Sequence, residues 1–100
     1  VIGNDDAGHE VKSMLDKIEV KSFLVEQKGR KTSRKTRLMA SHSQVVRYDK
    51  ESKNDINFES VKKLYSKLQE KINAYDIILL SDYAKGVLTN ELIEKVITIN

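Results

Sequence analysis

The sequence contains no cysteine and two histidines, His9 and His42, which stand far apart. Without cysteine, the chain has no disulfide framework and no thiolate metal site, and two separate histidines argue against a zinc site. Long apolar runs are missing too: the longest, residues 77–80, has four residues, whereas a membrane-spanning helix needs about 20. Residues 1–6 carry acids where a signal peptide would carry basic residues. These absences exclude disulfide-rich and membrane-spanning proteins and fit a cytoplasmic location.

Familiar catalytic and nucleotide-binding motifs are also missing. The sequence has no glycine-rich dinucleotide fingerprint and no Walker-type phosphate loop. Neither histidine has a nearby partner for a Ser-His-Asp or Cys-His arrangement. His9 is most simply a surface residue in a first helical turn, and His42 a turn residue. The sequence therefore shows neither nucleotide binding nor nucleophilic catalysis by itself.

Length and composition describe one soluble globular domain at most. The chain has 100 residues, of which 39% are hydrophobic and 33% charged, with a modest net charge of +3. It opens on Val-Ile-Gly without an initiator Met and stops at V-I-T-I-N, inside or just past an apolar-periodic segment. Natural domain borders usually fall in polar linkers, so we expect the parent protein to extend on both sides.

Four consecutive apolar residues, 77–80, predict a core strand over about residues 76–81, because a strand without polar alternation suits a parallel sheet buried on both faces. Ser81, Asp82, Tyr83, Lys85 and Gly86 follow it. In open α/β sheets, ligands collect outside the carboxyl ends of strands, which makes Asp82 and Lys85 candidates for the edge of a site. The alternative is an ordinary strand-to-helix loop, where polar residues and glycine are common.

Helical spacing of apolar residues predicts three helices: about residues 6–17, 58–73, and from residue 89 or 90 onward. Their apolar stripes are Val11, Met14, Leu15 and Ile18; Val61, Leu64, Tyr65, Leu68 and Ile72; and Leu92, Ile93, Val96 and Ile97. The acids at the start of the first helix, Asp5, Asp6 and Glu10, complement the helix dipole, and their simplest role is capping. Residues 21–27 read as a short strand. The order of elements predicts an α/β fold that begins with a βαβ unit.

A basic stretch, residues 28–37, contains only positive charges and leads into a predicted β-hairpin. Its arms are residues 33–40 and 44–49. Residues two apart on a strand share a face, so Lys35, Arg37 and Arg47 are expected on one surface. A hairpin with this much charge is not wholly buried, and covering something anionic would explain it.

Three interpretations of residues 28–37 remain open. They form a solvated mobile loop, contact nucleic acid phosphates, or bind a small phosphorylated ligand, for which Arg offers a planar fork and Lys a point charge. Stacking on single-stranded nucleic acid is disfavoured because the segment has no aromatic residue. A net charge of +3 does not choose between the three.

Three motifs carry a resemblance to a known family: G-N-D-D-A-G at the start, K-T-S-R-K-T-R followed by Q-V-V-R-Y-D-K-E, and above all L-L-S-D-Y-A-K-G-V-L. Together they resemble the ribokinase-like carbohydrate kinases, and among these the D-glycero-β-D-manno-heptose 7-phosphate kinases. The resemblance covers essentially all 100 residues. D-Y-A-K-G is its most specific element, since G-N-D-x-x-G is shared widely among ribokinase-like proteins.

The resemblance implies a central fragment of a three-layer α/β kinase, with the hairpin of about residues 33–49 as part of a lid that closes over the sugar. The parent would use ATP and Mg²⁺ to phosphorylate the anomeric hydroxyl of heptose 7-phosphate, giving heptose 1,7-bisphosphate. In many bacteria this kinase is the first domain of a bifunctional kinase and adenylyltransferase, which makes ADP-heptose for lipopolysaccharide. The sugar's phosphate would then meet Lys35, Arg37 and Arg47, while Asp82 would accept from a sugar hydroxyl and Lys85 would meet phosphate.

One element of the family pattern is absent. The kinases place their catalytic aspartate in a G-A-G-D motif at a helix N-terminus, and the motif does not occur in these 100 residues. We therefore name no catalytic residue, place most of the ATP site outside the chain, and expect the isolated chain to be inactive. The alternatives are a small basic α/β module that binds nucleic acid through residues 28–37, or a ribokinase-like kinase for another phosphorylated sugar. Unpaired strand edges in such a fragment would favour pairing between chains as a homo-oligomer.

Overall fold

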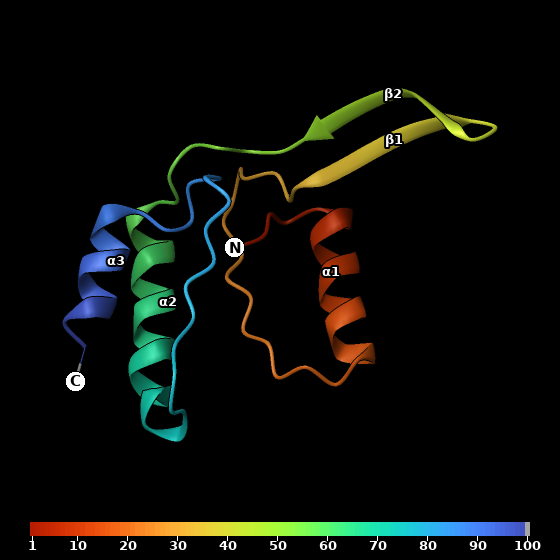
Figure 1. The fold of residues 1–100 in the computed structure, drawn as a ribbon. Helices are drawn as coiled ribbons and strands as arrows, with labels where there is room; N and C mark the ends of the chain where they lie inside the picture. The colour runs from red at the N-terminus through yellow and green to blue at the C-terminus, as the bar shows by residue number, and fades with distance from the viewer. Residues whose placement is uncertain (100) are drawn as a thin grey trace.

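The computed structural model describes residues 1–99, and within that range it is a small α/β structure. It has three α-helices, α1 (Asp6–Lys17), α2 (Phe58–Lys71) and α3 (Asn90–Ile97), and a 3₁₀ turn, η1 (Ile72–Ala74). Strands β1 (Arg34–Ala40) and β2 (Ser43–Lys50) form a two-stranded antiparallel hairpin (Figure 1). The three predicted helices and the hairpin are confirmed. Asn100, the last residue of the expected kinase fragment, lies outside the described residues.

Each helix begins at a side chain that accepts a hydrogen bond from the first turn. Asp5 Oδ1 accepts from the Gly8 amide at 2.8 Å, Asn57 Oδ1 from Ser60 at 2.9 Å, and Thr89 Oγ1 from Leu92 at 3.1 Å. Such N-caps satisfy amides that have no partner within the helix. Of the acids expected to cap α1, Asp5 is the N-cap, and Asp6 lies in the first turn of the helix.

The buried core lies between α2, α3 and the chain that leads into α2. Ile56, Val61 and Leu92 are buried together. Leu64, Tyr65 and Val96 pack against them from the predicted stripes, which brings α2 and α3 together. At the C-terminal end of α3, however, Ile97 is mostly exposed, so the expected inner face is covered only in part.

Residues 1–2, which precede α1 in the sequence, pair in parallel with residues 25–27, which follow it. The Ile2 amide donates to the Val25 carbonyl at 2.8 Å, and the Gln27 amide donates to the Ile2 carbonyl at 2.9 Å. This parallel contact has the order of a βαβ unit. The strand predicted over residues 21–27 is nevertheless wrong in extent: it amounts to an isolated bridge between Ile2 and Glu26, because two residues offer too short a neighbour for a longer ladder.

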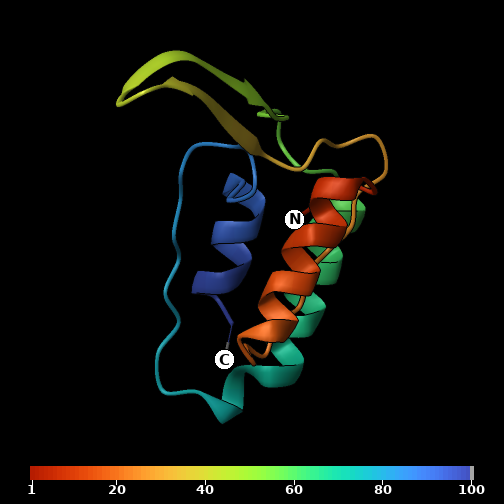
Figure 2. The same cartoon turned by 90° about the vertical axis from the view of Figure 1, so that its right-hand side faces the viewer.

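The predicted core strand over residues 76–81 is also wrong, because that segment forms no strand. It runs as an extended chain along the direction of α2 in Figure 1 and stands apart from α2 in Figure 2. Ile78 and Leu80, 38% and 42% exposed, line an apolar groove with Leu64 of α2, whereas Ile77 and Leu79 are 83% and 87% exposed. Within residues 1–99 no other strand lies beside the segment, so its backbone has no ladder partner and only one face is covered.

The hairpin stands away from the helices, as both views show (Figures 1 and 2). The Cα radius of gyration is 15.9 Å and the longest extent 53 Å, whereas a compact domain of this length has a radius of about 13 Å. The register is continuous from Arg34 opposite Lys50 to Leu38 opposite Val46, and a bulge follows at Met39. Nearly every hairpin side chain is exposed. None of the helices in residues 1–99 has the length and apolar character needed to cross a membrane.

Candidate functional site at the hairpin base

Glycines allow three segments to cross closely where the hairpin joins the helices. A Cβ at Gly3 would lie 1.9 Å from the Arg30 carbonyl oxygen, so only glycine fits there. Gly86 has φ +82°, and a Cβ on it would lie 2.2 Å from the Asn54 carbonyl oxygen. The Gly86 carbonyl in turn accepts from the Ile56 amide at 2.9 Å. The loop after the extended segment is thereby fixed against the chain that leaves β2.

Asp5 connects the G-N-D-D-A-G turn to the chain that enters β1. Besides capping α1, its carboxylate accepts from the Thr32 hydroxyl at 2.6 Å and from the Thr32 amide at 3.0 Å. The same hydroxyl accepts from the Gly3 amide at 2.8 Å. The hydrogen bonds from the Thr32 side chain and amide lower the pKa of Asp5, since they stabilise its charged form. Asp5 is thus a structural anchor for the start of the hairpin.

Arg30 lies before β1 and is buried, and its guanidinium donates to backbone carbonyls of two other segments. Nη1 donates to Asn54 at 2.7 Å and Nη2 to Ser52 at 3.3 Å, both of which follow β2. Nη2 also donates to the Lys85 carbonyl. A planar fork of donors suits such simultaneous contacts. One side chain therefore joins both ends of the hairpin to the D-Y-A-K-G loop.

Glu51 follows β2 and forms the second link to that loop. Its Oε1 accepts from Lys85 Nζ at 2.8 Å, and the more exposed Lys53 lies 3.5 Å from the same oxygen. The side chain of Glu51 is only 5% exposed, and that of Lys85 is 29% exposed. The Lys85 hydrogen bond is the main reason why the pKa of Glu51 is lowered; Lys35 contributes through its charge. We call Arg30, Glu51 and Lys85 the hairpin clamp.

Lys35, Arg37 and Arg47 share one face of the hairpin, as predicted, and we call them the cationic face. Arg37 is directly opposite Arg47, and Lys35 is opposite Asp49. Asp49 Oδ2 forms ion pairs with Arg47 Nη2 at 3.2 Å and with Lys35 Nζ at 3.5 Å. The hydrogen bond from Arg47 is the main cause of the lowered pKa of Asp49. Among residues 1–99, Arg37 differs from the other two in having no ion-pair partner.

The five candidate residues from the sequence are only partly brought together. Lys35, Arg37 and Arg47 lie side by side on the hairpin, and Lys85 is joined to the hairpin base through Glu51. Asp82 is exposed, and its Oδ1 accepts from the Ala84 amide at 2.8 Å in a local turn. The structure thus gives Asp82 a turn-forming hydrogen bond and, among residues 1–99, no hydrogen bond or ion pair with the four cationic residues.

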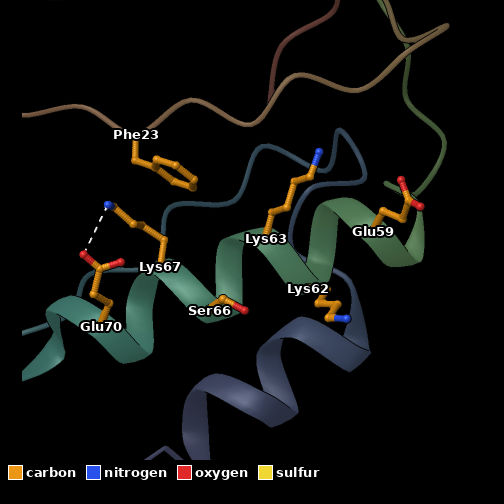
Figure 3. Close-up of a pocket in the computed structure, with 7 residues that line it drawn as sticks. All are labelled: Phe23, Glu59, Lys62, Lys63, Ser66, Lys67 and Glu70. Atoms are coloured by element: carbon orange, nitrogen blue, oxygen red, sulfur yellow. Dashed lines mark hydrogen bonds and ion pairs between the residues drawn. The ribbon is translucent and has the colours of Figure 1, made fainter.

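A second groove, of about 580 Å³, runs along α2 (Figure 3). Phe23 lines one side of this groove, and Lys67 Nζ lies 5.2 Å from the centre of its ring. The same Nζ lies 3.5 Å from Glu70 Oε1. Exposed lysines and glutamates of α2 line the remainder, and none of the five candidates does. Their mixed charges are those of a solvated helix face, which agrees with the amphipathic pattern of α2.

No metal site is evident in the described part of the chain. Among residues 1–99, no three His, Asp or Glu side chains gather closely enough to hold an ion. The carboxylates of the candidate site, Asp49 and Glu51, are each paired with lysine or arginine. These residues do not fit a Mg²⁺ site, and we assign them no step that involves one.

Sequence reasoning missed Arg30, Thr32 and Glu51. Arg30 lies within the basic segment of residues 28–37, and the sequence gives no sign that it would be buried rather than solvated. Thr32 and Glu51 contact residues 27 and 34 positions away, which no local pattern reveals. The available signal was their place immediately before and after the predicted hairpin, where two chain ends must be held together.

Comparison with known proteins identifies clear relatives, although no protein-family model matches the chain. It is 52% identical over 100 residues to Bifunctional protein HldE of Aliarcobacter butzleri, covering 99% of this chain and 21% of that protein. Proteins of the same name from Sulfurimonas denitrificans and Helicobacter pylori are 48% and 43% identical over 98% and 99% of this chain, covering 21% and 22% of their own lengths. The sequence is similar to one segment of these bifunctional proteins. The chain spans about a fifth of the length of these relatives.

Proposed function

We propose that this sequence is a segment of the kinase part of a bifunctional protein of the HldE type, acting in heptose metabolism for lipopolysaccharide. In this proposal the hairpin is a lid over a phosphorylated sugar, heptose 7-phosphate, which receives a second phosphoryl group from ATP at its anomeric hydroxyl. The similarity of 37–52% over nearly the whole chain supports the link to these bifunctional proteins. The assignment to the kinase part rests on the motifs and on the charged hairpin.

The main observation in favour of a phosphorylated substrate is that Arg37 and Arg47 lie directly opposite each other on the two strands. Like charges directly opposite one another on a hairpin destabilise it, and only Arg47 is compensated, by Asp49. Lys35 adds a third cation to the same face. A phosphate bound over this face would offset the repulsion, and Arg can meet it with two parallel hydrogen bonds.

Two other arginines near the hairpin, Arg30 and Arg34, are already engaged, which favours a small ligand over nucleic acid. Arg30 is buried and donates to carbonyls. Arg34 points to the other face of β1 and forms an ion pair with Glu10. A continuous basic surface over residues 28–37, which nucleic acid binding through backbone phosphates would need, is thereby reduced.

In this proposal the described residues bind the substrate, and none of them is assigned a chemical step. Lys35, Arg37 and Arg47 would bind and orient the sugar's phosphate, Lys85 would add a cation from the D-Y-A-K-G loop, and the lid would exclude water. ATP supplies the phosphoryl group, and neither ATP nor Mg²⁺ is placed on residues 1–99. A catalytic base is likewise not assigned to them.

The test is an ADP-release assay on a polypeptide of the relatives' length that carries this sequence, with heptose 7-phosphate as acceptor. We expect sugar-dependent release, and an Arg37→Met variant should raise KM for the sugar phosphate about tenfold, as loss of a charge-assisted contact predicts. Arg34→Met, which removes an arginine from the opposite face of the same strand, is the matched control and should change KM little. Absence of sugar-dependent release, or an equal effect of both variants, would refute the proposal.

A further inference from the structure

We propose that Arg30 and Glu51 are positioning residues that hold Lys85 in place, from the two ends of the hairpin, for the phosphate of the bound sugar. The inference rests on the proposed function, because it takes a sugar phosphate as the ligand of the cationic residues. It adds a role for two residues that do not belong to the cationic face.

Lys85 is held through both its backbone and its side chain. Its carbonyl accepts from Arg30 Nη2, and its ammonium donates to Glu51 Oε1 at 2.8 Å. Arg30 precedes β1 and Glu51 follows β2, so both contacts come from the base of the hairpin. The positions of the lysine and of the hairpin are consequently linked, and a change in one is transmitted to the other.

The clamp brings Lys85 toward the cationic face. Glu51 lies two positions beyond Asp49, which Lys35 and Arg47 contact at 3.5 and 3.2 Å, and the charge of Lys35 adds to the larger effect of Lys85 in lowering the pKa of Glu51. Glu51 Oε1 therefore lies between Lys53 and Lys85 and keeps these mutually repelling cations together. Without it, Lys85 would turn toward water, because its side chain is already 29% exposed.

The burial of the clamp indicates a specific position rather than a surface ion pair. Glu51 is 5% exposed, and its Oε2 has no hydrogen-bond partner among the described residues. Leaving a buried carboxylate oxygen unsatisfied costs stability. A buried side chain that carries such a cost is expected where its position matters for binding.

The test uses the protein of the relatives' length and compares Glu51→Gln, Lys85→Met and the double variant. If Glu51 acts through Lys85, Glu51→Gln should raise Kd for heptose 7-phosphate about tenfold, leave Kd for unphosphorylated heptose unchanged, and add nothing in the Lys85→Met background. Lys53→Met is the matched control, since it removes the longer and more exposed contact to the same oxygen, and should leave Kd unchanged. An additive double variant, or an unchanged Kd for Glu51→Gln, would overturn the inference.

A second readout does not depend on catalysis, and circular dichroism would check that each variant keeps its helices. Acetylation of Lys85, followed by mass spectrometry, should become several-fold faster in Glu51→Gln, because the amine loses its carboxylate partner, and in Arg30→Lys, because the backbone of Lys85 is no longer held at the hairpin base. An unchanged rate in both would overturn the inference alone. If the unmodified protein binds heptose 7-phosphate but transfers no phosphoryl group, the proposed kinase activity fails while the inference stands. If it does not bind the sugar phosphate, both fail.

Discussion

Asp5 combines a helix cap with a contact to a distant part of the chain, and this makes its charge important for stability. The hydrogen bonds from Thr32 lower its pKa in the folded state. A carboxylate with a lowered pKa stabilises the fold fully above its unfolded pKa, which is about 4, and this contribution is lost as the pH falls through the folded value. The pH dependence of folding should therefore contain a term from Asp5 below about pH 4.

We expect Asp5→Ala to lower the free energy of unfolding by about 1–2 kcal/mol at pH 7, as loss of an N-cap does, and by less at pH 3. Urea denaturation at the two pH values measures the difference. Asp6→Ala is the matched control: it removes a neighbouring acid from the first turn of α1 that is not the cap. An equal loss at both pH values would show that the charge of Asp5 contributes nothing beyond the side chain's shape.

The contacts of single residues were predictable only where they are local. The capping role of Asp5 follows from sequence because its partner is three residues away. Its bond to Thr32 spans 27 positions and depends on the path of the whole loop between them. The same holds for Arg30, whose burial depends on carbonyls of residues 52, 54 and 85.

At the scale of elements, the extended segment over residues 77–80 shows where pattern and structure separate. Its backbone has no strand partner within residues 1–99. In a polypeptide of only these 100 residues, we therefore expect the amides of residues 77–80 to exchange with solvent within seconds, while amides in the middle of α2 are protected by their helical bonds. Hydrogen exchange with mass spectrometric detection measures both in one experiment. Protection of residues 77–80 equal to that of α2 would mean that the segment is paired, as a strand would be.

The reason for this difference lies in how the two kinds of element are stabilised. A helix satisfies its backbone within itself, so apolar spacing and a capping residue sufficed to predict α1, α2 and α3. The hairpin also pairs locally, and the prediction of Lys35, Arg37 and Arg47 on one face followed from alternation alone. A strand of a parallel sheet depends on neighbours distant in sequence. The apolar run indicated that residues 77–80 suit burial, which the partial cover of Ile78 and Leu80 agrees with, but it could not supply the neighbours.

At the scale of the whole molecule, binding groups and catalytic groups are unevenly represented. The described residues bring together cations on a hairpin and a lysine held at its base. They offer no carboxylate cluster for a metal ion, and the G-A-G-D sequence that the proposed mechanism needs does not occur in the 100 residues. Binding of an anion and transfer of a phosphoryl group should thus be separable properties.

We therefore expect a polypeptide of only these 100 residues to show no sugar-dependent ADP release, even if the longer protein is an active kinase. Phosphoryl transfer is achieved by positioning and by stabilising developing charge, and removing the groups that do this typically lowers the rate by several orders of magnitude. The assay would compare equal amounts of the short and long polypeptides, and circular dichroism would check that the helices of the short one form. Sugar-dependent turnover by the short chain would contradict the proposed mechanism, because the short chain would then have to supply a catalytic base. In the candidate site, the carboxylates of Asp49 and Glu51 are paired with cations, and those of Asp5 and Asp82 form a helix cap and a turn.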